Sequence, residues 1–268
     1  MDIQPIITIL LYIAATLLLA ENVFNILEKF TKNNLIILIL GIFALSLHAD
    51  ILNQSIFLQT GFDFGFFNII SIIGWLVALI VLITSFFQPI QQLLLVLYPI
   101  AAITILLEQL FPNDRILEQS LPMGLRIHIL LSISAYSLLM IGALQALLLA
   151  LQDKFIKSKQ ISKIIDILPP LQIMEQLLIQ IIVIGFFLLS LSLTTGIMFI
   201  DNIFEQHLIH KTTLSILAWV IYAILLWGRW SLGWRGRRIT RWILVGFIVL
   251  ILAYTGSKFV LELILQRV

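Results

Sequence analysis

Four histidines are the side chains of this sequence best suited to hold a ligand. His48 and His128 lie within apolar stretches, and His207 and His210 stand three residues apart in DNIFEQHLIHKTTLS. Neutral imidazole is the commonest protein ligand for haem iron and for borderline metals. An imidazole at lipid depth is disfavoured unless it faces a bundle interior, a cavity or a ligand. The sequence therefore predicts either a metal-containing cofactor or buried polar contacts at these histidines.

Membrane spans must position these histidines. The chain is 61% hydrophobic and 11% charged, whereas soluble domains have about 45–50% apolar and 25% charged residues. Windows of about 20 residues, enough to cross a bilayer, predict an all-α polytopic membrane protein with eight spans in a single domain, residues 1–268. We expect the spans near residues 4–24, 34–51, 66–87, 91–110, 127–151, 176–200, 212–228 and 241–264.

The basic residues predict the orientation of these spans. Arg235, Arg237 and Arg238 follow the seventh span, and Lys and Arg are retained on the cytoplasmic side of a membrane. Placing this cluster inside puts eleven of the sixteen Lys and Arg residues inside and four outside, with Lys258 within the last span. We therefore expect both termini on the outer, periplasmic side. All four histidines then fall on that same side.

The composition excludes several kinds of chemistry. With no cysteine the chain has no disulfide, thiolate ligand or thiol exchange, so redox chemistry would belong to a cofactor or a partner. The basic residues follow the topology and do not form a nucleic-acid footprint, so no nucleic acid is expected as a partner. No catalytic triad order, phosphate loop or HExxH motif is present. We therefore expect a protein that is not an enzyme.

Several motifs resemble a known family. LPMGLRIHILLSISAYSLLMIGALQALLLAL, residues 121–151, opens a span with His128 and continues with Ser-Ala-Tyr and Gly-Ala-Leu. IGFFLLSLSLTTGIMF, LSILAWVIYAILLWG, GWRGRR and AYTGSKF follow in order, and LGIFALSLHAD extends the likeness to the second span. In these motifs, which cover most of residues 121–264, the chain resembles the cytochrome c assembly, or haem-handling, membrane proteins of the CcsA, CcmC and HemX type.

The resemblance implies a function at the outer face of a bacterial inner membrane. Members of this family hold haem there with histidines and a Trp-rich segment, and pass it to a partner protein of cytochrome c synthesis. His128 matches their first outer-face haem histidine, and DNIFEQHLIHKTTLS replaces the Trp-rich segment.

Haem is therefore the expected cofactor, and the candidate contacts are His128, His48, His210 and His207. His128 and His48 are the candidate iron ligands, and we expect them to approach each other. Membrane lipid and a cytochrome c assembly protein are the expected partners.

Alternatives remain for individual residues and for the whole chain. His48 is either a ligand or a buried histidine oriented by Asp50, and His207 and His210 share a helix face only if their loop is helical. The arginine cluster is explained by topology and by contact with anionic lipid headgroups. A transporter using Glu21, Glu108 and His48, or a haem-free subunit that stabilises a partner, are the alternative functions.

Overall fold

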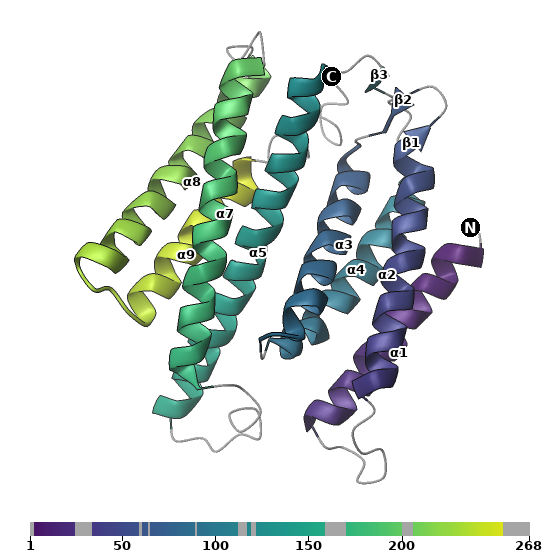
Figure 1. Ribbon diagram of the computed structural model, residues 1–268, viewed down its shortest axis with the longest axis horizontal. Coiled ribbons are helices and arrows are strands. Elements are labelled where there is room, and N and C mark those ends of the chain that lie inside the picture. Colours follow the sequence, from purple (N-terminus) through teal and green to yellow (C-terminus); the bar gives the residue numbers. More distant parts are fainter. Residues whose placement is uncertain are drawn as a thin grey trace. The chain divides into compact units, whose positions relative to one another are not determined.

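The computed structural model describes residues 3–24, 34–58, 61–63, 65–88, 90–111, 117–118, 122–158, 170–199 and 206–253. Helices make up almost all of these residues (Figure 1). The chain divides into two compact units. Unit one comprises residues 1–120 and 162–168, and unit two comprises residues 121–161 and 169–268.

The described part of unit one is a bundle of four helices and one short 3₁₀ helix. In it α1 packs against α2 and α4, and α3 packs against α2 and α4. The fully buried rings of Tyr12 and Tyr98 meet in this core with their centroids 5.4 Å apart. The elements are α1 (Ile3–Phe24), α2 (Asn34–Ile56), α3 (Phe66–Ser85), η1 (Gln91–Leu93) and α4 (Leu94–Leu110).

Three two-residue strands at one end of unit one were not predicted from the sequence. β1 (Phe57–Leu58) pairs antiparallel with β2 (Gly61–Phe62), and β2 pairs antiparallel with β3 (Leu117–Glu118). The small sheet therefore ties the segment after α2 to the segment after α4 (Figure 1). Backbone groups outside helices need partners, and strand pairing supplies them here.

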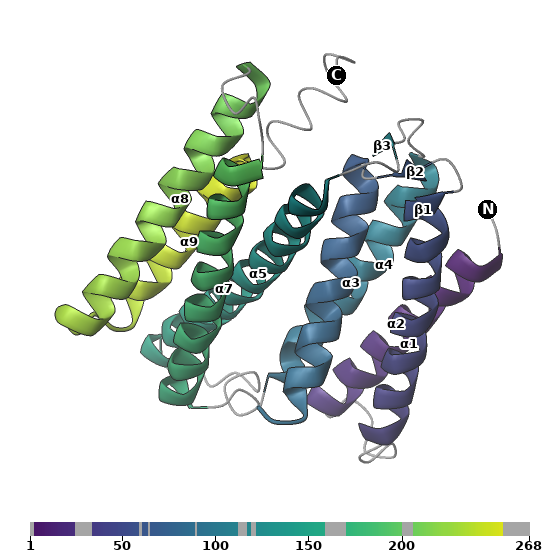
Figure 2. The same ribbon diagram turned by 45° about the horizontal axis from the view of Figure 1, so that its top comes forward.

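Unit two contains the helices α5 (Met123–Lys157), α7 (Leu171–Phe199), α8 (Gln206–Ser231) and α9 (Arg237–Ile251). α5 and α7 run side by side, and α9 packs against both α5 and α8 (Figure 1 and Figure 2). Small residues let the first two helices approach closely, as is common in membranes. A Cβ added at Gly185 of α7 would lie 2.8 Å from Cδ2 of Leu139 on α5.

The all-α membrane class is confirmed, since seven described helices are long and apolar enough to cross a bilayer. The expected eighth span, 241–264, begins within α9 and continues beyond the described residues. The eight-span count, the single domain and the position of the termini therefore stay predictions. Several helices extend beyond the expected spans: α2 continues to Ile56 and α5 to Lys157, whereas α7 begins at Leu171 and α8 at Gln206. Hydropathy marks the apolar part of a helix, whereas a helix can continue through polar turns.

Candidate functional site

His128 of α5 is oriented by the main chain of α7. Its Nδ1 atom lies 2.9 Å from the backbone carbonyl oxygen of Ser192. A carbonyl oxygen can only accept a hydrogen bond, so Nδ1 donates and carries the ring proton. In the neutral ring the lone pair therefore belongs to Nε2. This is the tautomer in which Nε2 can bind a metal.

The other polar groups around His128 leave its Nε2 atom available. The nearest hydroxyl, Ser132 Oγ, is 3.5 Å away, which is too long for a strong hydrogen bond. That hydroxyl donates instead to the His128 carbonyl oxygen at 2.7 Å. It can then accept from Ser192 Oγ, also at 2.7 Å. No described hydroxyl therefore has to be displaced for Nε2 to take a ligand.

The ring of His128 packs against Gly196, one helical turn beyond Ser192. A Cβ at Gly196 would lie 2.9 Å from Cε1 and 3.2 Å from Nδ1 of the ring. The glycine thus provides the space that the imidazole occupies between α5 and α7. His128 itself is only partly buried, so this ring is open to a ligand on part of its surface.

The start of α8 carries the two other candidate histidines. His207 and His210 belong to a stretch whose backbone is helical, which is the condition for an i, i+3 pair to share a face. The structure does not describe their side chains, so their contact with haem stays a prediction. The next residue, Lys211, is near enough to His128 for the two charges to interact.

His48 has a different environment, in unit one. Its side chain is fully buried, Nδ1 lies 3.2 Å from the Tyr12 hydroxyl, and Nε2 lies 3.0 Å from Ser71 Oγ. Both ring nitrogens are therefore engaged, and ligation would require one hydrogen bond to break. These contacts favour the buried-histidine alternative over the iron-ligand alternative.

Asp50 does not orient His48, contrary to the expectation from sequence. Its Oδ2 atom instead accepts hydrogen bonds from Gln4 Nε2 at 2.8 Å and Gln54 Nε2 at 2.9 Å. Asp50 stands two residues after His48, which directs it to another side of α2. His48 and His128 belong to separate units, so their predicted approach stays a prediction.

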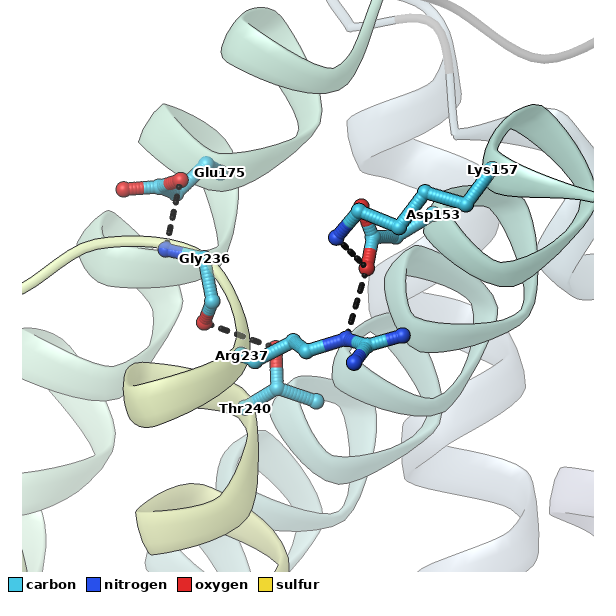
Figure 3. A network of polar contacts seen from close by, with 6 residues as sticks. All are labelled: Asp153, Lys157, Glu175, Gly236, Arg237 and Thr240. Atoms are coloured by element: carbon cyan, nitrogen blue, oxygen red, sulfur yellow. Dashed lines mark hydrogen bonds and ion pairs between the residues drawn. The ribbon is translucent and has the colours of Figure 1, made fainter.

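The arginine end of unit two contains two acidic partners that the sequence analysis missed. Glu175 of α7 accepts from Arg229 Nη1 at 2.8 Å and from the Gly236 backbone N–H at 3.2 Å. Asp153 of α5 accepts from Arg237 Nε at 2.9 Å and from Lys157 Nζ at 2.7 Å. Figure 3 shows the start of α9 held between these two carboxylates.

This network explains the GWRGRR motif structurally. Gly233 and Gly236 have positive φ angles of 64° and 57°, a region that glycine enters readily. Arg238 lies over the ring of Trp234, 5.1 Å from its centroid. The motif therefore forms an ordered turn between α8 and α9. The sequence contained a signal for these two acidic partners. Asp153 directly follows the expected span 127–151 and Glu175 directly precedes the expected span 176–200, so both were expected at the same inner boundary as the arginines.

Among the described residues, no group of three or more His, Cys, Asp or Glu side chains could hold a metal ion. Among the described side chains, the donor that fits haem iron is an imidazole nitrogen, Nε2 of His128. A haem needs only one or two axial protein ligands, so this donor is of the right kind.

Comparison with known proteins gives a consistent result. The family of cytochrome c assembly proteins matches residues 6–265. The inner membrane protein YpjD of Escherichia coli strain K12 is 34% identical over 263 residues, which cover 97% of this chain and all of YpjD. The cytochrome c biogenesis protein CcsA of Prochlorococcus marinus strain MIT 9515 is 35% identical over 80 residues, 29% of this chain and 26% of CcsA. No solved structure matches the chain.

Proposed function

Because the chain belongs to the cytochrome c assembly protein family, we propose that it is a haem-handling protein of the bacterial inner membrane. It would hold haem at the outer ends of α5, α7 and α8 and take part in cytochrome c assembly with a partner protein. The observation that carries this proposal is the Nε2 atom of His128, whose nearest described polar neighbour is 3.5 Å away and whose ring is fixed by the Ser192 carbonyl. The surrounding helices would position His128 and provide apolar side chains around the haem.

His128 would act as the axial ligand through Nε2. The carbonyl of Ser192 keeps the proton on Nδ1, as the outer hydrogen bond of a metal-ligating histidine does. When bound, haem would supply the iron and the ring that reacts with an apocytochrome, and the protein would supply no covalent chemistry. Its own part is to bind, orient and shield from water, so it is not proposed to be an enzyme.

The surface around His128 suits an apolar ring. Met123, Ile127 and Leu130 on α5 are exposed, and so are Ile197, Met198 and Phe199 at the end of α7. Such side chains can face lipid or the edge of a porphyrin. The proximity of Lys211 would suit a haem propionate, because an ammonium group attracts a carboxylate.

An absorption spectrum of the detergent-purified protein tests this function. After expression with ample haem, we expect a Soret band corresponding to about one haem per chain, since one axial histidine site is proposed. His128→Ala should remove or strongly weaken this band. Ser132→Ala is the matched control on the same helix face and should keep it, because Ser132 donates to a carbonyl and not to Nε2.

Two spectra would contradict haem binding at His128. A wild-type protein that elutes as a folded species and has no Soret band would favour the haem-free subunit. A His128→Ala variant with an unchanged spectrum would remove His128 as the ligand, even if haem is bound elsewhere.

A further inference from the structure

Unit one contains a carboxyl group that the haem proposal does not use. Glu108 lies in the last turn of α4, and its side chain is only 4% exposed. Neither carboxylate oxygen has a hydrogen-bond partner among the described residues. By contrast, the carboxylates of Asp153 and Glu175 are each held by two donors. Glu108 is therefore buried without the contacts that usually stabilise a carboxylate.

The polar groups near Glu108 come from the elements packed around it. Ser55 of α2, Ser71 of α3 and the Asp63 carboxylate lie close to its carboxyl. Ser55 Oγ donates to the Ile51 carbonyl oxygen at 2.9 Å, so its proton is used elsewhere. Ser71 Oγ is 3.0 Å from Nε2 of His48. The titratable neighbours are thus Asp63 on one side and His48 on the other, with Tyr12 beyond His48.

No described lysine or arginine forms an ion pair with Glu108. Among the described residues, the basic partners in ion pairs are Lys157, Arg229 and Arg237, all of which belong to unit two. Among the described residues, the charge that acts on Glu108 is the carboxylate of Asp63, and a neighbouring like charge disfavours a second one. Burial of an unpaired charge is far more costly than burial of a neutral acid.

We propose that Glu108 is a proton-binding site within the membrane-embedded part of unit one. Its carboxyl carries a proton at neutral pH, and Asp63 offers the route by which that proton exchanges at the end of the bundle. Intramembrane carboxyl groups commonly serve such a function. On release the proton leaves an Oε atom of Glu108 and passes to water at the end of the bundle, and a carboxylate remains on Glu108. The proposal does not rest on the proposed haem function, because His128 and its neighbours belong to the other unit.

Modification by dicyclohexylcarbodiimide tests the proposal in native membranes. This apolar reagent reacts with protonated carboxyl groups: the acid O–H adds across a C=N bond, and rearrangement leaves a stable N-acylurea with no leaving group. Peptide mass spectrometry should locate the adduct at Glu108. We expect labelling to fall about tenfold per pH unit once the acid ionises. Glu175, which is ion-paired with Arg229, is the internal control and should remain unlabelled.

Added sodium distinguishes a bound proton from a bound metal cation at Glu108. Protection of Glu108 by added sodium chloride at constant pH, but not by choline chloride, would show a metal cation in the site and overturn the proton assignment. Equal labelling of Glu108 and Glu175 would overturn it as well.

The thermal stability of Glu108→Gln provides a second measurement that does not depend on reagent access. A neutral acid resembles its amide, so the variant should unfold within a few degrees of the wild type at neutral pH. Folding of the wild type would take up a proton that the unfolded chain lacks, so its stability should fall as pH rises, and that of the variant should not. A large loss of stability in Glu108→Gln at neutral pH, or identical pH dependence of both proteins, would refute the proposal.

Discussion

The Nδ1 atom of His128 lies 2.9 Å from the backbone carbonyl oxygen of Ser192, so a main-chain group of α7 fixes the imidazole of α5. No side-chain substitution at position 192 removes that oxygen. The orientation of the proposed haem ligand is therefore tied to the packing of two helices. Substitutions that alter this packing near the ring should affect haem binding more than substitutions elsewhere along the same interface.

Gly196→Ala is expected to weaken haem retention about tenfold or more, because its Cβ would lie 2.9 Å from Cε1 of His128 and displace the ring. Overpacking of this kind costs about 1–3 kcal/mol. Haem occupancy from the Soret band measures the effect. Gly185→Ala is the matched control, since it crowds Leu139 on the same interface about 16 Å further along α7. It should lower the melting temperature and spare the spectrum; the reverse pattern would contradict the proposed ligand geometry.

Single replacement of His207 or His210 by Ala is expected to leave membrane insertion intact. Both residues lie at the start of α8, ahead of the apolar stretch that begins at Lys211. Each replacement should weaken haem retention less than His128→Ala does, which titration of the haem-stripped variants with haem would measure. If either one abolished the Soret band while His128→Ala spared it, the order of ligands would be wrong.

Tyr12→Phe is expected to destabilise the protein by about 1 kcal/mol, the usual loss for one hydrogen bond, because the Tyr12 hydroxyl contacts Nδ1 of His48. His48→Ala should cost about 2–4 kcal/mol, since it adds a cavity. In a double-mutant cycle the two losses should sum to more than the loss in the double variant. Strictly additive losses would argue against a direct contact, and Tyr12→Phe should leave the absorption spectrum unchanged.

Glu175→Gln is expected to destabilise the protein more than Asp153→Asn. The Arg229–Glu175 pair is mostly buried, with 20% and 16% of the side chains exposed, and breaking such a pair costs about 2–4 kcal/mol. Arg237 and Lys157, the partners of Asp153, are about 60% exposed, and exposed pairs contribute roughly 0–1 kcal/mol. Thermal unfolding in detergent measures the stability of both variants. An equal loss of stability in Glu175→Gln and Asp153→Asn would contradict the expected order.

Both termini are expected on the outer side of the membrane, with the Arg235 to Arg238 loop in the cytoplasm. The reason is the retention of basic residues on the cytoplasmic side. A fluorescent protein that matures only in the cytoplasm should stay dark when fused after Val268. Fusion of the same reporter to a chain truncated after Arg235 is the control and should be bright. A bright full-length fusion would invert the proposed orientation.

Much of the molecule could be predicted from sequence because hydropathy and charge act locally. Long apolar runs require helices, since the backbone of a spanning segment must satisfy its own hydrogen bonds in lipid. The positions of seven described helices and the placement of His128 near the start of α5 follow from such signals. The family followed from the resemblance of motifs. The small β-sheet could not be found this way, because each of its strands is only two residues long.

The sequence by itself thus determined the membrane class, the helical segments and which histidines were available. Only the tertiary structure decided what His48 and His128 contact. It paired His128 with Ser192, 64 residues away, and His48 with Tyr12, 36 residues away. It also left the carboxyl group of Glu108 buried without a partner among the described residues. Hydropathy states that a helix crosses the membrane, but the rotation of each helix about its axis depends on how side chains of distant segments pack together.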